Sequence, residues 1–290
     1  MPSILSRLKD RNFLNKKPLK IIILGKTDTG KTFLSFKLAK EFLKLKKRVG
    51  ILCSDLGQSS VGPPGCVSFK AIFSEKELKS FYLPADLMEF VGSLSPSENL
   101  TSHLLATRLI LDKALKKTDV IIINTTGYIK GEGGFLKVSK IRITNPDIIV
   151  AIQEKDELEK ILNLFEGVIH IIRLKKSKRV KKRTKKMRAK FREELFKAYF
   201  KNSEVVNLLI NSNLKFFREK MIVGLLDKKL NTLGLGKIEE IRKGKLKILV
   251  PSSVNEEKIK FILPSTIIIN QDSCYFCKSM IKFTQCRQII

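Results

Sequence analysis

The 290-residue sequence predicts an α/β fold, in which a doubly wound, mainly parallel sheet is followed by a small β-rich C-terminal domain. Short apolar runs rich in β-branched residues recur along the first 175 residues, and segments with helical spacing separate them. After residue 200 the helical segments stop, and short strand-like pieces follow one another. Strands that alternate with helices are typical of a parallel sheet, whereas consecutive strands favour a separate β module.

Each apolar run is too short for a helix and indicates a strand buried on both faces. These runs are Leu19–Leu24, Val49–Cys53, Val120–Ile123, Ile148–Ile152 and Val168–Ile172. Apolar residues at helical spacing predict helices over Thr32–Lys46 and Leu100–Leu115. Later strands are expected at Ile222–Leu226, Ile238–Ile241, Leu246–Val250 and Thr266–Ile269. We therefore expect a short basic segment over residues 1–18, a main domain over 19–201 and a C-terminal domain over 202–290.

Positive charge dominates the composition, with 57 Lys and Arg against 28 Asp and Glu and a formal net charge of +29. Twelve of the 18 residues from Lys175 to Arg192 are basic. Clustered cations favour a polyanionic partner such as nucleic acid, although a solvated basic helix is an alternative. The basic stretch extends over residues 175–200.

The composition argues against membrane and secreted proteins. No apolar run approaches the roughly 20 residues that span a bilayer, and the N-terminus lacks the pattern of a secretory signal. The five cysteines are odd in number and thinly spread, which favours reduced thiols over a disulfide framework. We therefore expect a cytoplasmic protein that has no membrane partner.

A phosphate-binding pattern, G-x-x-x-x-G-K-[ST], follows the first predicted strand directly. Its two glycines let the backbone N–H groups converge on phosphate oxygens at the start of a helix. Lys31 is expected to reach the β- and γ-phosphates, and the Thr32 hydroxyl to bind Mg²⁺. The nucleotide-binding residues predicted from this P-loop are Gly25, Lys26, Thr27, Asp28, Thr29, Gly30, Lys31 and Thr32.

A second carboxylate for the metal is expected at the end of a neighbouring strand, where Asp55 follows Val49–Cys53. A turn or N-cap role is the alternative for Asp55. The next residues, 56–65, form a loop rich in glycine and proline where an acceptor could dock. No Asn-Lys-x-Asp sequence follows a later strand to recognise guanine, so ATP is favoured over GTP.

Five motifs in order resemble the polynucleotide 5′-hydroxyl kinases, the P-loop family of RNA processing that includes Clp1, Grc3 and Nol9. The resemblance covers most of residues 20–250. The motifs are the P-loop with Thr27-Asp28 inside it, Asp55–Gln58 followed by Pro64-Gly65, the clasp-like segment Gly92–Pro96, and the segment Asn124–Gly131. The fifth is the basic segment 175–200, which resembles the family's helical lid. Tyr128 stands where the family usually has Trp, and the family's N-terminal β domain has no counterpart in the short segment before the first strand.

The resemblance implies an ATP- and Mg²⁺-dependent kinase that transfers the γ-phosphate to the 5′-hydroxyl end of RNA, or of DNA. It implies Lys31, Asp55, Arg183 and Arg188 as catalytic residues, with Asp55 as the base and, beside Thr32, as a metal ligand. The residues that it implies at the polynucleotide are Gln58, Pro64, Gly65, Ser95, Pro96, Thr126, Tyr128 and Arg192. No motif indicates a protein partner.

Two other functions remain open at this point. An inactive scaffold would hold ATP intact beside RNA, and a partitioning or maturation ATPase would hydrolyse it without an acceptor. His103 is expected near nucleic acid or on a helix surface, and His170 in the core. Cys274, Cys277 and Cys286 lack a fourth zinc ligand nearby, so ordinary thiols are favoured there.

Overall fold

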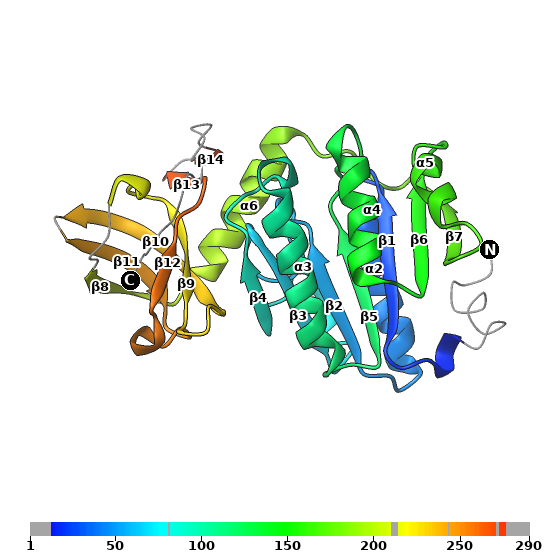
Figure 1. Cartoon of the computed structure of the whole chain (residues 1–290), viewed down its shortest axis with the longest axis horizontal. Coiled ribbons are helices and arrows are strands. Elements are labelled where there is room, and N and C mark those ends of the chain that lie inside the picture. The colour runs from blue at the N-terminus through cyan, green and yellow to red at the C-terminus, as the bar shows by residue number, and fades with distance from the viewer. Residues whose placement is uncertain (1–12, 81, 210–213, 243, 271–272, 277–290) are drawn as a thin grey trace.

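The computed structural model describes residues 13–80, 82–209, 214–242, 244–270 and 273–276, and it contains two main sheets (Figure 1). The larger sheet has seven strands in the order β4-β3-β2-β5-β1-β6-β7. They are β1 (Leu19–Gly25), β2 (Val49–Ser54), β3 (Cys66–Ile72), β4 (Leu87–Phe90), β5 (Val120–Thr125), β6 (Ile148–Gln153) and β7 (His170–Lys175). Strands β2, β5, β1, β6 and β7 run parallel, which confirms the predicted sheet.

Strands β3 and β4 are additions that the sequence did not predict. They extend the sheet beyond β2 through antiparallel pairing. Ser68 and Lys70 interrupt the apolar run of β3, and β4 is only four residues long and contains Glu89. Ser68 and Glu89 are nevertheless buried, because β4 faces the C-terminal part of the chain rather than solvent.

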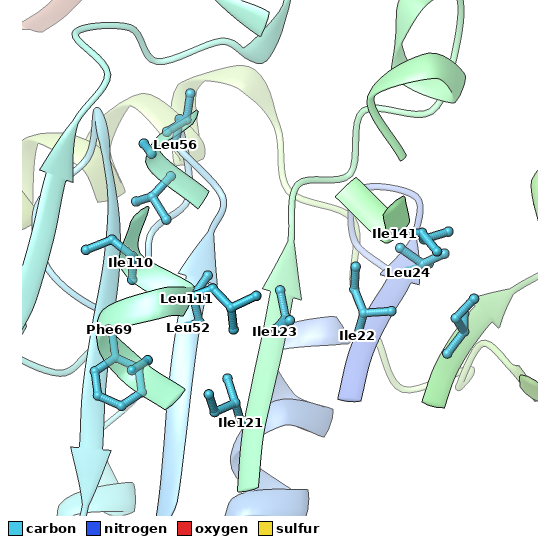
Figure 2. Packing of buried hydrophobic residues seen from close by; sticks show 14 of the residues in the cluster. Ile22, Leu24, Leu52, Leu56, Phe69, Ile110, Leu111, Ile121, Ile123 and Ile141 are labelled. Carbon is cyan, nitrogen blue, oxygen red and sulfur yellow. The ribbon is translucent and has the colours of Figure 1, made fainter. Parts of the chain in front are cut away.

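Helices cover both faces of the larger sheet. Helix α2 (Lys31–Lys44) packs on one face, and α3 (Leu100–Leu115), α4 (Glu132–Thr144) and the short α5 (Glu159–Leu162) pack on the other. Figure 2 shows the second core, in which Ile22, Leu52 and Ile123 from the strands meet Leu111 of α3 and Ile141 of α4. The two apolar layers fix the sheet edge from which the functional loops emerge.

The apolar spacing located α3 but not its buried face. Leu105 and Leu109 are exposed, whereas Ala106, Thr107 and His103 are buried against the sheet. The expectation that His103 lies near nucleic acid or on a helix surface is therefore wrong. Small and polar residues face inward here because α3 passes close to β2 and β3.

The smaller sheet is antiparallel, with five strands in the order β12-β9-β10-β11-β8, and a hairpin, β13–β14, lies beside it. The strands are β8 (Ser203–Leu209), β9 (Ile222–Leu226), β10 (Thr232–Arg242), β11 (Lys245–Pro251), β12 (Phe261–Leu263), β13 (Ile267–Asn270) and β14 (Ser273–Phe276). Short 3₁₀ helices occur at Phe13–Asn15, Glu77–Lys79, Pro96–Glu98, Asn163–Phe165, Leu214–Phe216 and Glu256–Lys258. The predicted β-rich C-terminal part is thus confirmed.

Helix α6 (Lys185–Tyr199) lies between the two sheets (Figure 1). Its buried Phe196 packs against Cys66 of β3 and Leu235 of β10, and the Tyr199 hydroxyl accepts a hydrogen bond from the Leu235 N–H at 2.8 Å. The C-terminal end of the predicted lid is therefore anchored in the core. None of the described helices is long and apolar enough to cross a membrane.

Candidate active site

The P-loop connects β1 to α2 at the carboxyl edge of the larger sheet. Gly30 has φ +93°, and Asp28 adopts the left-handed region with φ +56°. A Cβ atom at Gly25 would lie 2.8 Å from the carbonyl oxygen of Ile152 on β6, so only glycine fits between these strands. This curled backbone before a helix N-terminus is the geometry that binds phosphate.

Lys31, at the start of α2, is 6% exposed and is bound by the loop itself. Its Nζ donates a hydrogen bond to the carbonyl oxygen of Lys26 at 2.6 Å. Burial lowers the pKa of Lys31 to about 8, against the opposing charges of Asp55 and Asp28. A polyanion beside this ammonium would relieve the cost of its burial.

The oxygen donors around Thr32 suit a magnesium ion. The Asn124 amide Nδ2 donates to the Thr32 hydroxyl at 3.2 Å, and among the described residues Asn124 Oδ1 is a buried oxygen without a hydrogen-bond donor. Asp55 Oδ1 accepts from the amides of Gly57 and Gln58 at 3.3 and 3.1 Å. Hydroxyl, carboxylate and amide oxygens are ligands of the kind that Mg²⁺ takes, so these residues fit the metal. Asn124 was not predicted as part of this group.

A cavity of about 630 Å³ opens beside the P-loop. It unites ten of the residues predicted from the motifs: Lys26, Thr27, Asp55, Gln58, Ser95, Pro96, Thr126, Tyr128, Arg188 and Arg192. Gly57, Leu94, Gly127, Ile129 and Lys130 complete its lining. The clasp, the segment after β5 and the lid thus line one space together with the P-loop.

The structure does not bring Pro64 and Gly65 into this cavity. Both are buried, and Gly65, with φ +83°, bonds to its neighbours through its backbone. Its N–H donates to the Leu56 carbonyl, and its own carbonyl accepts from Val91 and Gly92. The Pro-Gly pair therefore connects the loop after Asp55 to the segment that leads into the clasp.

The lid is docked on the P-loop through Asp28. The Arg188 guanidinium forms an ion pair with Asp28 Oδ2 at 2.7 Å, and the Arg183 backbone N–H donates to the same oxygen at 3.0 Å. Burial opposes ionisation of this carboxyl, but these hydrogen bonds and charges hold the pKa of Asp28 below its usual value. The P-loop and the lid are thus joined by direct contacts between their own residues.

Gln58 makes a second connection between the lid and the loop after Asp55. Its Nε2 donates to the Arg188 carbonyl at 3.3 Å, and its Oε1 accepts from Arg183 Nη1 at 3.4 Å. Among the described residues, Arg188 Nε and Arg192 Nε are buried donors with no acceptor. Unsatisfied guanidinium donors that line a cavity are suited to phosphate oxygens.

Two fully buried lysines, Lys137 and Lys140 of α4, lie beneath the site and were not predicted. Helix α4 itself was missed, because Gly133, Gly134 and the lysines obscure its apolar face. Leu136 and Ile141, which flank the lysines in the buried face of α4, were the available signal. His103 lies against Lys140, with 2.9 Å between His103 Nε2 and Lys140 Nζ.

The described residues hold no group of three or more His, Cys, Asp or Glu side chains that could bind a metal. Cys277 and Cys286 lie outside the described residues, as does the side chain of Cys274.

The parallel sheet, the P-loop, and a carboxylate at the end of the neighbouring strand together define a P-loop NTPase fold with a candidate nucleotide site. Residues 25–202 match the family described as mRNA cleavage and polyadenylation factor CLP1 P-loop. Because this match covers more than half of the chain, the protein belongs to the CLP1 P-loop family.

Curated relatives include a polyribonucleotide 5′-hydroxyl-kinase of Methanocaldococcus jannaschii, which is 40% identical over 214 residues, 71% of this chain and 56% of the relative. A kinase of the same name from Pyrococcus abyssi is 34% identical over 203 residues, 69% of this chain and 55% of the relative. The polyribonucleotide 5′-hydroxyl-kinase Clp1 of Danio rerio is 27% identical over 195 residues, 64% of this chain and 44% of the relative. The chain thus spans about half the length of the curated relatives that it matches.

Among solved structures, a chain of the wild-type Clp1p–Pcf11p complex superposes with a TM-score of 0.75. The superposition covers 91% of this chain and 77% of the other, at 14% sequence identity. It therefore extends the shared fold through the lid and into the C-terminal sheet.

Proposed function

We propose that this protein is an ATP-dependent polynucleotide kinase that phosphorylates the 5′-hydroxyl end of RNA. The observation that supports this most is the single cavity, because Lys26 and Thr27 of the P-loop line it together with the clasp, Tyr128 and Asp55. A protein that only hydrolyses nucleotide does not need a binding surface for an acceptor beside its P-loop. The names of the related kinases agree with this proposal.

In the proposed reaction, the terminal 5′ oxygen of RNA attacks the γ-phosphorus of ATP. The new bond joins this oxygen to phosphorus, the bond to the bridging oxygen of ADP breaks, and the hydroxyl proton moves to the Asp55 carboxylate. Asp55 is oriented for this role, because the two amides that bind its Oδ1 fix the carboxylate. ADP leaves with the electron pair of the broken bond.

Charge on the transferring phosphoryl group would be neutralised by cations of the P-loop and of the lid. Lys31 would exchange the Lys26 carbonyl for phosphate oxygens, and Arg188 would exchange Asp28 for them. A magnesium ion bound to Thr32 and Asp55, with Asn124 nearby, would supply further positive charge at the phosphates.

The acceptor is proposed to lie between Tyr128 and the clasp. Tyr128 presents an aromatic ring on which a terminal base can stack, while Ser95 supplies a hydroxyl at the cavity wall. Exposed cations of the lid, including Arg179, Lys181 and Lys182, would follow the backbone beyond the first nucleotide. This arrangement favours a single-stranded end.

The test is transfer of γ-labelled phosphate to matched RNA and DNA oligonucleotides with a 5′-hydroxyl, with a 5′-phosphorylated RNA as the blocked control. We expect label on the 5′-hydroxyl RNA, none on the blocked RNA, and none with Lys31→Ala. Equal hydrolysis of ATP with and without RNA, and no labelled RNA, would indicate an ATPase instead. ATP that stays bound and intact beside 5′-hydroxyl RNA would indicate a scaffold.

A further inference from the structure

Lys137 and Lys140 are unusual because both side chains are fully buried. Lysine is almost never completely buried unless its charge is paired, since removing an ammonium from water is costly. No carboxylate bonds directly to either lysine among the described contacts. The two lysines lie three residues apart on α4, so they project from the same face of the helix.

Lys140 is bound to the end of β2. Its Nζ donates to the carbonyl oxygen of Ser54 at 3.1 Å and contacts the Ser54 hydroxyl at 2.5 Å. The third contact, to His103 Nε2, fills the remaining donor position. Because Ser54 directly precedes Asp55, this ammonium fixes the backbone from which the proposed base projects.

Lys137 is bound in the same way to the end of β5, the strand next to β2. Its Nζ donates to the Thr125 hydroxyl at 3.0 Å and to the Thr126 carbonyl. The following residue, Gly127, packs so closely on the P-loop that a Cβ atom there would lie 2.3 Å from the Thr27 nitrogen. Lys137 therefore fixes the segment that carries Thr126 and Tyr128 into the cavity.

Stability alone does not explain why two lysines occupy these buried positions. Burial lowers the pKa of Lys137 and brings that of Lys140 to about 7, which shows how strongly the core disfavours their charge. Apolar side chains of similar volume are often as stable as buried charged groups or more stable. The negative charge of Asp55 raises the pKa of both lysines and so favours their charged forms. The two lysines are therefore coupled electrostatically to the proposed base.

We propose that Lys137 and Lys140 are positioning residues, which hold the ends of β5 and β2 so that the acceptor segment and Asp55 face the P-loop together. This proposal rests on the kinase function above. Lys140 acts on the base and Lys137 on the acceptor segment, so their loss should have different kinetic consequences. A displacement of about 1 Å in such a geometry costs on the order of 10²-fold in rate.

The kinetic test compares Lys140→Met, Lys137→Met and the control Lys113→Met. Lys113 lies near the C-terminal end of α3, and it does not line the cavity. Its Nζ donates to Glu89 at 2.9 Å and to Asn231 at 3.0 Å. We expect Lys140→Met to lower kcat by about 10²-fold with little change in either KM. Lys137→Met should mainly raise the KM for 5′-hydroxyl RNA, and Lys113→Met should lower only the melting temperature.

Amide hydrogen exchange tests the positioning without any need for catalysis. In Lys140→Met the Gly57 and Gln58 amides, which bind Asp55, should exchange faster, and in Lys137→Met the Tyr128 amide should do so. Lys113→Met should change neither segment. If the variants exchange faster as expected but the wild-type protein transfers no phosphate, the kinase proposal fails. The positioning role of the two lysines is still measured in that case.

Equal kinetic parameters and equal exchange in all three variants would overturn the inference. If a methionine variant does not fold, Ser54→Ala keeps the inference testable, because it removes one oxygen contact of Lys140 and preserves the backbone. It should lower kcat several-fold, and an unchanged kcat in Ser54→Ala would contradict the role of Lys140.

Discussion

The proposed nucleotide-binding and acceptor-binding halves of the site are built in different ways. The proposed nucleotide half is one continuous stretch, the P-loop from Gly25 to Thr32, of which Lys26 and Thr27 line the cavity. Its binding groups are mainly backbone N–H groups and the first residues of a helix. The acceptor half is assembled from the loop after β2, the clasp, the segment after β5 and the lid. The nucleotide half is therefore fixed locally, whereas the acceptor half depends on packing between segments far apart in the chain.

The largest loss of kcat is expected from a change in the lid, which contacts both halves of the site. Arg188→Ala removes the guanidinium that binds Asp28 and lines the cavity, and loss of such a cation should lower kcat by about 10³-fold or more. Lys190→Ala, on the exposed side of the same helix, is the matched control. Equal kcat in the two variants would show that the lid takes no part in the transfer step.

Asp55→Asn tests the junction between the halves. The amide keeps the shape of the carboxylate but cannot accept the hydroxyl proton, so kcat should fall by about 10²–10⁴-fold. Isothermal titration with ATP and with RNA separately checks that each half still binds. Wild-type turnover in Asp55→Asn would remove this residue from the proposed chemistry.

Tyr128→Ala should affect the acceptor half alone. Base stacking on an aromatic ring contributes about 1–3 kcal/mol, so the KM for 5′-hydroxyl RNA should rise by about 5–150-fold while the KM for ATP stays constant. Tyr128→Phe is the control, because it keeps the ring. A parallel rise in both KM values would mean that Tyr128 supports the P-loop instead.

The smallest expected effect is the pH dependence of the free energy of unfolding. The folded pKa of Lys140, about 7, lies below its unfolded value, so the unfolded chain binds more protons from about pH 7 to 10.5. Stability should therefore rise with pH through this window, by at most about 1.4 kcal/mol per pH unit from this group. The groups that face this ammonium are His103 from α3, Cys53 from β2, Asp55 directly after β2, and Lys137 from the same helix.

The measurement is chemical denaturation at pH 7 and pH 9. Wild-type protein should gain more stability between these values than Lys140→Met does. Identical gains would mean that Lys140 is not the source of the pH dependence.

The same contrast explains what the sequence could predict. The P-loop and the five parallel strands were predicted because each signal is contained in a short segment, either a glycine pattern or a β-branched run. The clasp and lid residues were found only through the family motifs. Their meeting in one cavity depends on where distant segments pack.

The remaining features depend on burial that local sequence does not reveal. Lys137 and Lys140 are charged residues in a helical segment that also contains two glycines, and such a pattern usually indicates a solvent-exposed surface. Pro64 and Gly65 resemble an exposed loop, although they are buried beside the segment that leads into the clasp. His103 lies inward because it shares the buried face of α3 with Ala106 and Ile110.

The most direct test is a crystal structure of the protein with a non-hydrolysable ATP analogue, Mg²⁺ and a short 5′-hydroxyl RNA. We predict the triphosphate on the P-loop, the RNA end between Tyr128 and the clasp, and the terminal 5′ oxygen within about 3.2 Å of an Asp55 oxygen. An RNA end bound outside the cavity, or a terminal oxygen that points away from Asp55 and the γ-phosphate, would contradict the proposed transfer.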